Sequence, residues 1–146
     1  MSQQEDERYM RLALEEAQLA YESGEIPIGA VVVCDDRVIA RAHNEVERLS
    51  DPTAHAEVLA VTAATQYMGS KFLGDCRLYV TIEPCTMCAG ALHWARLREV
   101  IYGASEEKFG YQRYAPEIFP RATKVRGGVL AEEARALMQS FFRARR

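Results

Sequence analysis

Three residues in two short stretches of the sequence have side chains that are typical metal ligands. His55 lies in "TAHAE", and Cys85 and Cys88 lie in "PCTMC" at the expected start of a helix. This spacing puts both sulfurs on one side of the first turn, where the positive helix end favours thiolates. Alone, "PCTMC" also suits a redox dithiol or half of a structural zinc knuckle, and "HAE" suits a polar helix start. Together the stretches supply three ligands, the number in a catalytic zinc site that keeps one position for water.

A carboxylate two residues after the histidine completes the chemistry. Glu57 lies on a different side of the helix from His55, so its side chain is expected to reach over the metal rather than bind it. Zinc lowers the pKa of a bound water from about 15.7 toward about 7, and a neighbouring carboxylate can take the released proton. We therefore predict hydrolysis by a zinc-activated water with Glu57 as proton carrier. A catalytically idle zinc module would need neither Glu57 nor an open coordination position.

Helices and strands that alternate along the chain must position these residues. Apolar periodicity predicts helices over residues 6–21, 54–68, 85–96 and 131–145, and strands over 28–34, 37–43, 77–82, 98–104 and 123–129. Thr53 is expected to cap the second helix, and Trp94 is expected to lie in the core. Residues 104–123 show no pattern that places them. The order indicates one domain, residues 1–146, with a three-layer α/β/α fold, a mixed five-stranded sheet and a ligand site at one sheet edge.

Composition and charge limit the class of protein. Hydrophobic residues make up 49% and charged residues 27%, which is ordinary for a packed domain. The acidic start of the chain does not resemble a signal peptide and no membrane-length apolar run occurs, so we expect a cytoplasmic location. Residues 1–107 hold 9 basic and 18 acidic side chains, whereas residues 108–146 hold 9 and 3. A basic last quarter suits nucleic acid, although a solvated helix end is the plainer explanation from charge alone.

The remaining cysteines and histidines have plainer explanations. Cys34 and Cys76 stand alone in or beside apolar strands, where free cysteine behaves as a small buried hydrophobe. His43 lies at a strand end and His93 lies well inside the third helix. We expect both histidines to be hydrogen-bonded or exposed rather than to bind metal.

Longer stretches carry a resemblance across nearly the whole chain. "EIPIGAVVV", "HNEVERLSDPTAHAE", "LYVTIEPCTMCAGAL" and "GGVLAEEARALMQSFFRARR" occur in this order, and "HAE" with "PCTMC" is the signature of zinc nucleobase deaminases. The chain resembles the bacterial tRNA-specific adenosine deaminases. The resemblance implies a cytidine-deaminase-like fold, a homodimer, and one zinc per chain on His55, Cys85 and Cys88. It also implies Glu57 as proton shuttle and hydrolytic conversion of adenosine to inosine at the wobble position of a tRNA anticodon stem-loop.

The same resemblance assigns residues to the substrate. It implies that Asn44 hydrogen-bonds a flipped base and that the backbone around Ile28, Ala56 and Ile82 walls the pocket. Basic residues of the last helix are implied to lie near the RNA; these are Arg143, Arg145 and Arg146.

Two stretches depart from that family and keep a second substrate class open. The stretch "EEKFGYQRYAPEIFPRATKVRGG" is shorter than in the tRNA enzymes, aromatic, and without histidine, and "ALHWAR" resembles guanine deaminases. A deaminase of a free purine base or nucleoside is therefore the alternative, although a small neutral base needs no cationic surface. The side chains of Phe109, Tyr111, Arg113 and Tyr114 fit equally well with stacking on RNA bases and with packing against a dimer partner.

Overall fold

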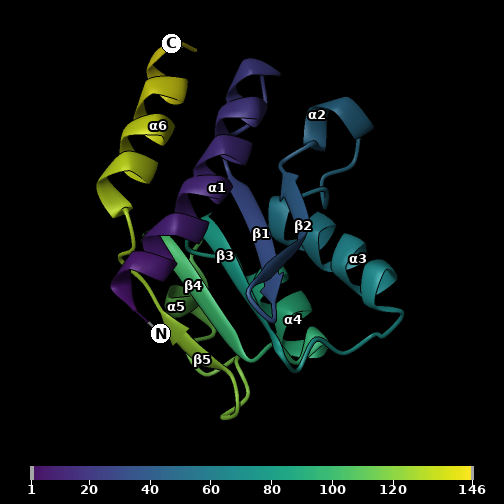
Figure 1. Cartoon of the computed structure of the whole chain (residues 1–146). Helices are drawn as coiled ribbons and strands as arrows, with labels where there is room; N and C mark the ends of the chain where they lie inside the picture. The colour runs from purple at the N-terminus through teal and green to yellow at the C-terminus, as the bar shows by residue number, and fades with distance from the viewer. Residues whose placement is uncertain (1, 146) are drawn as a thin grey trace.

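The computed structural model describes residues 2–145 and contains one mixed sheet between two layers of helices (Figure 1). The predicted three-layer α/β/α fold with five strands is confirmed. The helices are α1 Gln3–Glu22, α2 Val46–Leu49, α3 Ala56–Met68, α4 Thr86–Ala95, α5 Tyr111–Tyr114 and α6 Ala131–Arg143. The strands are β1 Gly29–Cys34, β2 Arg37–His43, β3 Cys76–Ile82, β4 Glu99–Ala104 and β5 Lys124–Arg126.

The strand order β2-β1-β3-β4-β5 brings the ends of several strands to one edge. Strand β1 runs antiparallel to β2 and β3, whereas β3, β4 and β5 are parallel. The start of β1, the end of β2 and the ends of β3 and β4 therefore meet at the same edge. Ligand sites of open α/β sheets form at such an edge, beyond the carboxyl ends of the parallel strands.

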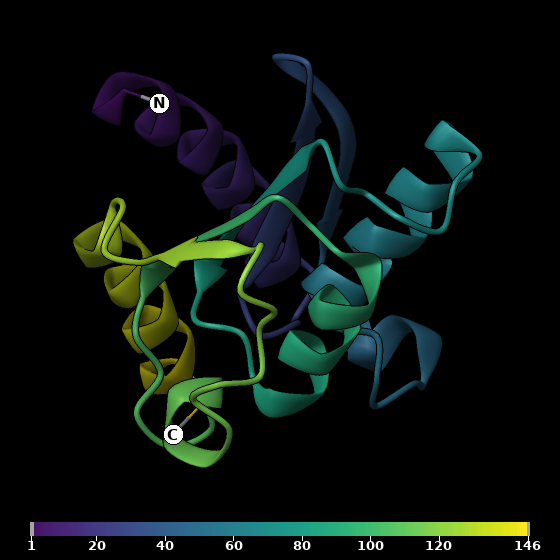
Figure 2. The same ribbon diagram turned by 90° about the horizontal axis from the view of Figure 1, so that it is seen from below.

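Alternating side chains of β1 fill the two cores on opposite faces of the sheet. Val32 contributes to the larger core, which includes small residues of α3 and α4, and Val31 contributes to the core under α1. Figure 2 shows α1 and α6 on one side of the sheet and α3 and α4 on the other. All residues of β1 and β3 are buried, because helices cover both faces.

A glycine permits the close contact between α1 and the start of β1. A Cβ atom at Gly29 would lie 2.1 Å from the carbonyl oxygen of Ala13 and 2.5 Å from the backbone nitrogen of Ala17. Only glycine fits there without moving the helix backbone. The contact sets the position of the start of β1 relative to α1, and hence the position of Ile28, which directly precedes β1.

Helix α3 begins differently from the sequence prediction. It starts at Ala56 rather than at residue 54. Its N-cap residue is His55, whose side chain makes no capping hydrogen bond to the helix. Thr53 does not cap the helix, because its hydroxyl donates to the Asp51 carboxylate at 2.7 Å. The polar segment before it also contains the short helix α2, where only a loop was predicted. Position 55 is therefore a cap residue whose imidazole is directed elsewhere.

Two aromatic predictions were wrong. Trp94 is 69% exposed, because the buried stripe of α4 runs through Cys88, Leu92 and Ala95 and leaves Trp94 on the outer side. Tyr111 is only 6% exposed and its ring packs edge-on against Phe119 with centroids 5.0 Å apart. Tyr111 is thus a core residue of the segment that the sequence did not place, and it is free neither for stacking on bases nor for contact with a partner subunit.

None of the helices within residues 2–145 combines the length and the apolar composition that a membrane span requires.

Candidate active site

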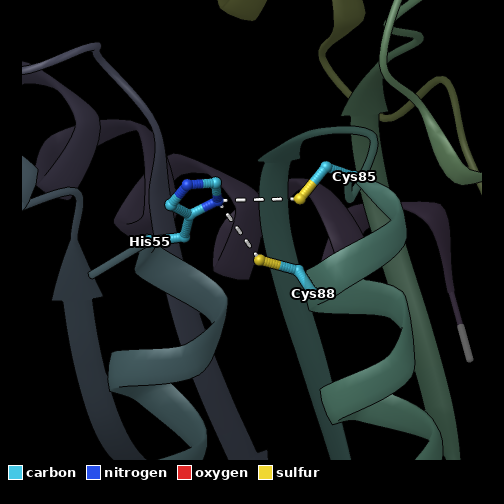
Figure 3. A group of neighbouring side chains, drawn as sticks. All are labelled: His55, Cys85 and Cys88. Carbon is cyan, nitrogen blue, oxygen red and sulfur yellow. Dashed lines mark hydrogen bonds between the residues drawn. The ribbon is translucent and has the colours of Figure 1, made fainter. Parts of the chain in front are cut away.

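The predicted metal ligands come together where the first turns of α3 and α4 face each other. His55 is the N-cap residue of α3 and Cys85 is the N-cap residue of α4, and Cys88 lies one turn into α4. Figure 3 shows the His55 ring and the two sulfurs directed toward one another across the gap. The His55 Nδ1 atom lies 3.6 Å from Cys85 Sγ and 3.4 Å from Cys88 Sγ. Among the described residues, these three form the group able to hold a metal ion, with ligand atoms within 4.8 Å of one another.

The spacing of these atoms matches tetrahedral zinc. A zinc ion about 2.05 Å from nitrogen and about 2.3 Å from sulfur would hold the two ligand atoms about 3.6 Å apart. The observed nitrogen-to-sulfur distances are 3.6 and 3.4 Å. One histidine and two cysteines also make a donor set that zinc favours. The three side chains could therefore hold a zinc ion at ordinary ligand distances.

The site favours negative charge on sulfur. Hydrogen bonds from the Cys88 thiol and from His55 lower the pKa of the Cys85 thiol to about 4. The hydrogen bond to Cys85 and burial raise the pKa of Cys88. Cys85 is therefore the first of the two thiols to ionise, and the Cys88 thiol donates to the resulting thiolate. The pKa of His55 is raised chiefly by its hydrogen bond to Cys85. The two helix N-termini that meet here add positive potential.

Glu57 lies beside the ligands in the first turn of α3 and is 3% exposed. Burial raises the pKa of its carboxyl from 4.5 to about 7. A carboxyl that titrates near neutral pH can both accept and return a proton under physiological conditions. Glu57 also lines the cleft described below, so its carboxyl has access to a ligand.

Asn44 connects the end of β2 to the start of α3. Its Oδ1 atom accepts a hydrogen bond of 2.7 Å from the backbone N–H of Ala56. The backbone N–H of Asn44 donates to the Ile28 carbonyl oxygen at 3.1 Å. The side chain is 4% exposed and lines the cleft. With Oδ1 occupied, the amide NH₂ group is the part of Asn44 that can donate to a ligand.

A cleft of about 1170 Å³ opens in front of the ligands. Ile28 and Ile82 line it, as the resemblance implied, whereas Ala56 is fully buried behind Asn44 and does not line it. Helix α6 forms the opposite wall through four side chains; these are Arg135, Met138, Phe141 and Phe142.

The three arginines assigned to RNA have different positions. Arg145 lines the cleft, with its guanidinium 3.8 Å from the centroid of the Phe141 ring. Arg143 is exposed on α6 but does not line the cleft. Arg146 lies outside the described residues. A cation that sequence reasoning missed, Lys108, lines the cleft from the other side.

Two buried glutamates, which no sequence pattern had indicated, bind backbone N–H groups in the walls of the cleft. Glu25 is 2% exposed, and its carboxylate accepts from the backbone N–H groups of Glu47 and Arg48 at 3.0 and 2.9 Å, at the start of α2. Glu83 is 5% exposed and accepts from the N–H groups of Glu106 and Gln112 at 3.0 and 3.1 Å. Both lie in short polar segments without periodicity, so their partners were visible only in the folded chain.

The other histidines and cysteines are structural, as predicted. His43 Nδ1 lies 2.9 Å from Glu16 Oε1, and His93 Nδ1 lies 2.6 Å from the Ile118 carbonyl oxygen. Cys34 and Cys76 are buried free thiols that face each other across β1 and β3.

Comparison with known proteins agrees with this arrangement. The family model for MafB19-like deaminases matches residues 4–146. A tRNA-specific adenosine deaminase from Agrobacterium fabrum (strain C58) is 43% identical over 143 residues, which cover 94% of each chain. The chain belongs to the tRNA-specific adenosine deaminase family. Membership of this family accounts both for the order of the sequence motifs and for the arrangement of the site in this deaminase.

Solved structures extend the comparison to the fold. A structure from a study of A-to-I editing by deaminases at the wobble position of transfer RNA is 41% identical to this deaminase. Its TM-score is 0.84, and the match covers 89% of this chain and 98% of that one. Guanine deaminase from Bacillus subtilis is 40% identical, with a TM-score of 0.67, and the match covers 77% of this chain and 75% of that one. The wobble-editing structure is therefore matched over more of both chains.

Proposed function

We propose that this deaminase converts adenosine to inosine at the wobble position of a tRNA anticodon stem-loop. The observation that carries the proposal is the meeting, in one cleft, of the His55, Cys85 and Cys88 group with the buried Glu57 carboxyl, opposite the aromatic and basic side chains of α6. The relatives that match over nearly their whole length are named for the same reaction.

His55, Cys85 and Cys88 would hold one zinc ion per chain. When bound, zinc supplies the Lewis acidity that brings the pKa of a water to about 7. Glu57, whose carboxyl pKa is raised to about 7 by burial, takes the proton of the attacking water and delivers it to N1 of adenine. It then carries the second proton of that water, from the hydroxyl now on C6, to the amino group as the C6–N bond breaks and the C6=O bond forms. Ammonia leaves and inosine remains in the RNA.

Asn44 and two isoleucines would hold the base during this proton transfer. The amide NH₂ group of Asn44 donates to an acceptor on the base, while its Oδ1 stays on the Ala56 N–H and keeps the side chain fixed. Ile28 and Ile82 line the same cleft and supply apolar contacts for the ring. A base in an anticodon loop is already unpaired, so turning it into the cleft costs little.

The size of the cleft favours RNA over a free base. Its volume of about 1170 Å³ exceeds the range of about 300 to 1000 Å³ that is usual for small-molecule pockets. Exposed aromatic rings and cations line its outer part, including Phe109, Phe142, Lys108 and Arg145. Such a rim suits nucleotides that flank the reacting base, with rings for stacking and cations for phosphates.

Deamination of a free purine base is the second candidate, and the similarity to guanine deaminase supports it. The tryptophan on which the motif resemblance rested is exposed and does not line the cleft of its own chain, so it does not shape that cleft for guanine. This candidate is therefore the weaker one.

The decisive experiment offers the purified protein three substrates: an anticodon stem-loop with a wobble adenosine, free adenosine and free guanine. Inosine that appears only in the stem-loop supports the proposal, and a stem-loop with guanosine at the wobble position is the matched control. Ammonia from guanine, with no change in the RNA, would establish the second candidate instead.

The proposal includes assembly as a homodimer in the cytoplasm, where tRNA is modified. Exposed aromatic side chains around α3 and α4 support the dimer, because they supply apolar surface that an isolated chain leaves in water; these are Tyr67, Phe72 and Trp94. Light scattering during size-exclusion chromatography tests it, with a monomeric mass as the contrary result.

A further inference from the structure

Loop 105–112 follows directly after strand β4 and lines the cleft through residues 105–109, and its last two residues begin helix α5. The Glu106 carboxylate closes the loop on itself by accepting from the backbone N–H groups of Lys108 and Phe109 at 3.2 and 2.7 Å. The Gly110 N–H donates to the Glu106 carbonyl at 2.9 Å. These bonds fold the loop but do not attach it to the rest of the protein.

Glu83 makes that attachment. Its carboxylate is 5% exposed, and Oε1 accepts from the Glu106 N–H at 3.0 Å while Oε2 accepts from the Gln112 N–H at 3.1 Å. One carboxylate thus holds both ends of the loop. Hydrogen bonds to a charged acceptor are about twice as strong as neutral ones.

The backbone beside Glu83 supports the same contact. The Pro84 carbonyl accepts from the Tyr111 N–H at 2.9 Å, and Cys85 forms an isolated β-bridge with Gly110. A Cβ atom at Gly110 would lie only 2.4 Å from Glu83 Oε2, so the carboxylate reaches the loop only because that position is glycine. The segment that carries the first cysteine ligand and the loop are therefore joined side by side.

Two side chains of the loop line the cleft and are of kinds that bind nucleotides. Phe109 is 64% exposed although it is aromatic, and it lines the cleft together with Lys108. An exposed ring next to a cation suits an unpaired nucleotide, whose base stacks while its phosphate meets the ammonium group. The loop engages Phe109 through its backbone N–H, which donates to Glu106, and the residue remains exposed at the cleft.

We propose that Glu83 is a positioning residue that holds loop 105–112 against the metal-binding segment, so that Phe109 stacks on an RNA nucleotide next to the reacting adenosine. The inference rests on the proposed function for its substrate, and it assigns a second nucleotide subsite to the same cleft. Glu83 also lines the cleft, but both of its carboxylate oxygens accept hydrogen bonds from the loop. Its effect on the reaction passes through the position of the loop.

The first measurement needs no substrate. In Glu83→Gln, one acceptor oxygen remains for two N–H donors, so hydrogen exchange at the Glu106 or Gln112 amide should become at least about tenfold faster. Zinc content should stay at the wild-type level. Gly110→Ala is the second variant. It leaves Glu83 intact, but its Cβ would lie 2.4 Å from both Glu83 Oε2 and the Glu106 carbonyl oxygen, so it displaces the carboxylate together with the loop backbone and should show the same faster exchange. Unchanged exchange in both variants would overturn the attachment.

The second measurement uses the anticodon stem-loop. Glu83→Gln should raise KM about fivefold or more, which is what the loss of one stacked base costs, and should leave kcat within about twofold. Glu107→Gln is the matched control, because Glu107 is an exposed carboxylate of the same loop that also lines the cleft. If only charge mattered, both variants would lower KM for a polyanion. Opposite directions, with KM raised only in Glu83→Gln, support the positioning role.

A double-mutant cycle identifies the side chain through which Glu83 acts. Phe109→Ala should raise KM by a similar factor, and Glu83→Gln should add little in the Phe109→Ala background. Independent, multiplying effects would contradict the role of Phe109, and a fall in kcat with unchanged KM would contradict positioning altogether. If the wild-type protein does not deaminate the stem-loop, the proposed function fails, while the exchange measurement still decides whether Glu83 holds the loop.

Discussion

The Oδ1 atom of Asn44 accepts a hydrogen bond of 2.7 Å from the backbone N–H of Ala56. Ala56 is the first residue of α3, and its N–H is one of the four that a helix start leaves without a partner. The N-cap residue, His55, directs its ring toward the two cysteines, so its side chain caps none of these N–H groups. Asn44, eleven positions before His55, therefore supplies a side-chain acceptor for the start of α3.

Substitution of Asn44 should separate capping from substrate binding. Asn44→Ala leaves the Ala56 N–H buried without an acceptor, which should lower the free energy of unfolding by about 1 to 3 kcal/mol and abolish turnover. Asn44→Asp keeps an acceptor for the helix but loses the NH₂ donor, so it should retain most of the stability and still lose activity. Urea denaturation together with an inosine assay measures both effects. An active Asn44→Asp protein would show that the amide donor does not hold the base.

Zinc content should distinguish ligand from proton carrier. Wild-type protein should contain about one zinc per chain, and Cys88→Ala should lose both zinc and turnover because a ligand at the buried centre of the site is gone. Glu57→Gln should keep its zinc and lose activity by a factor of about 100 or more, the usual contribution of general acid–base catalysis. Elemental analysis of the purified proteins provides the readout. Loss of zinc from Glu57→Gln would place Glu57 among the ligands instead.

The sequence predicted the framework because its signals are local. Strand β2 was placed at its observed bounds, and β1 and β3 within one residue, since β-branched residues fill them. The ligand group was predictable because metal coordination restricts both residue type and spacing. These features depend on side chains that are close in sequence or bound to one common ion.

The features that the sequence did not reveal depend on contacts between distant segments. Glu83 and Glu25 are ordinary acidic residues in their own stretches, and only the fold brings backbone N–H groups to their carboxylates. Trp94 was misplaced because α4 is apolar on more than the side that it buries. Residues 104–123 had no periodicity because their order comes from Glu83 and from the buried Tyr111 rather than from a repeating pattern.

The four thiols should differ sharply in reactivity once the metal is removed. Cys85 is partly exposed and its pKa is lowered to about 4, so it is a thiolate at neutral pH in the metal-free protein. Cys34 and Cys76 are buried, and burial raises the pKa of Cys76 to about 12. Iodoacetamide should therefore modify Cys85 at least about tenfold faster than Cys34 or Cys76. Peptide mass spectrometry gives the rates, and added zinc should protect Cys85; equal rates at all sites would contradict the burial.

Glu57 should destabilise the folded chain that it serves. Its carboxyl pKa rises from 4.5 to about 7 on folding, because burial disfavours the charged form. Between these values the folded protein keeps a proton that the unfolded chain has released, so stability falls as pH rises through this window. Above it, the cost approaches about 3.5 kcal/mol, at about 1.4 kcal/mol for each pKa unit.

Glu57→Gln removes this charge and should therefore stabilise the metal-free protein, by up to about 3 kcal/mol near pH 8. Near pH 4 the carboxyl is neutral in both states, so wild type and variant should unfold at similar urea concentrations. Denaturation of the two metal-free proteins at both pH values tests the prediction. The sign is decisive: a variant that is less stable near pH 8 would mean that the buried carboxylate is favourably bound, and that its pKa is not raised by burial. A positive result would show that the proton shuttle is retained at the expense of stability, which is typical of a residue kept for catalysis.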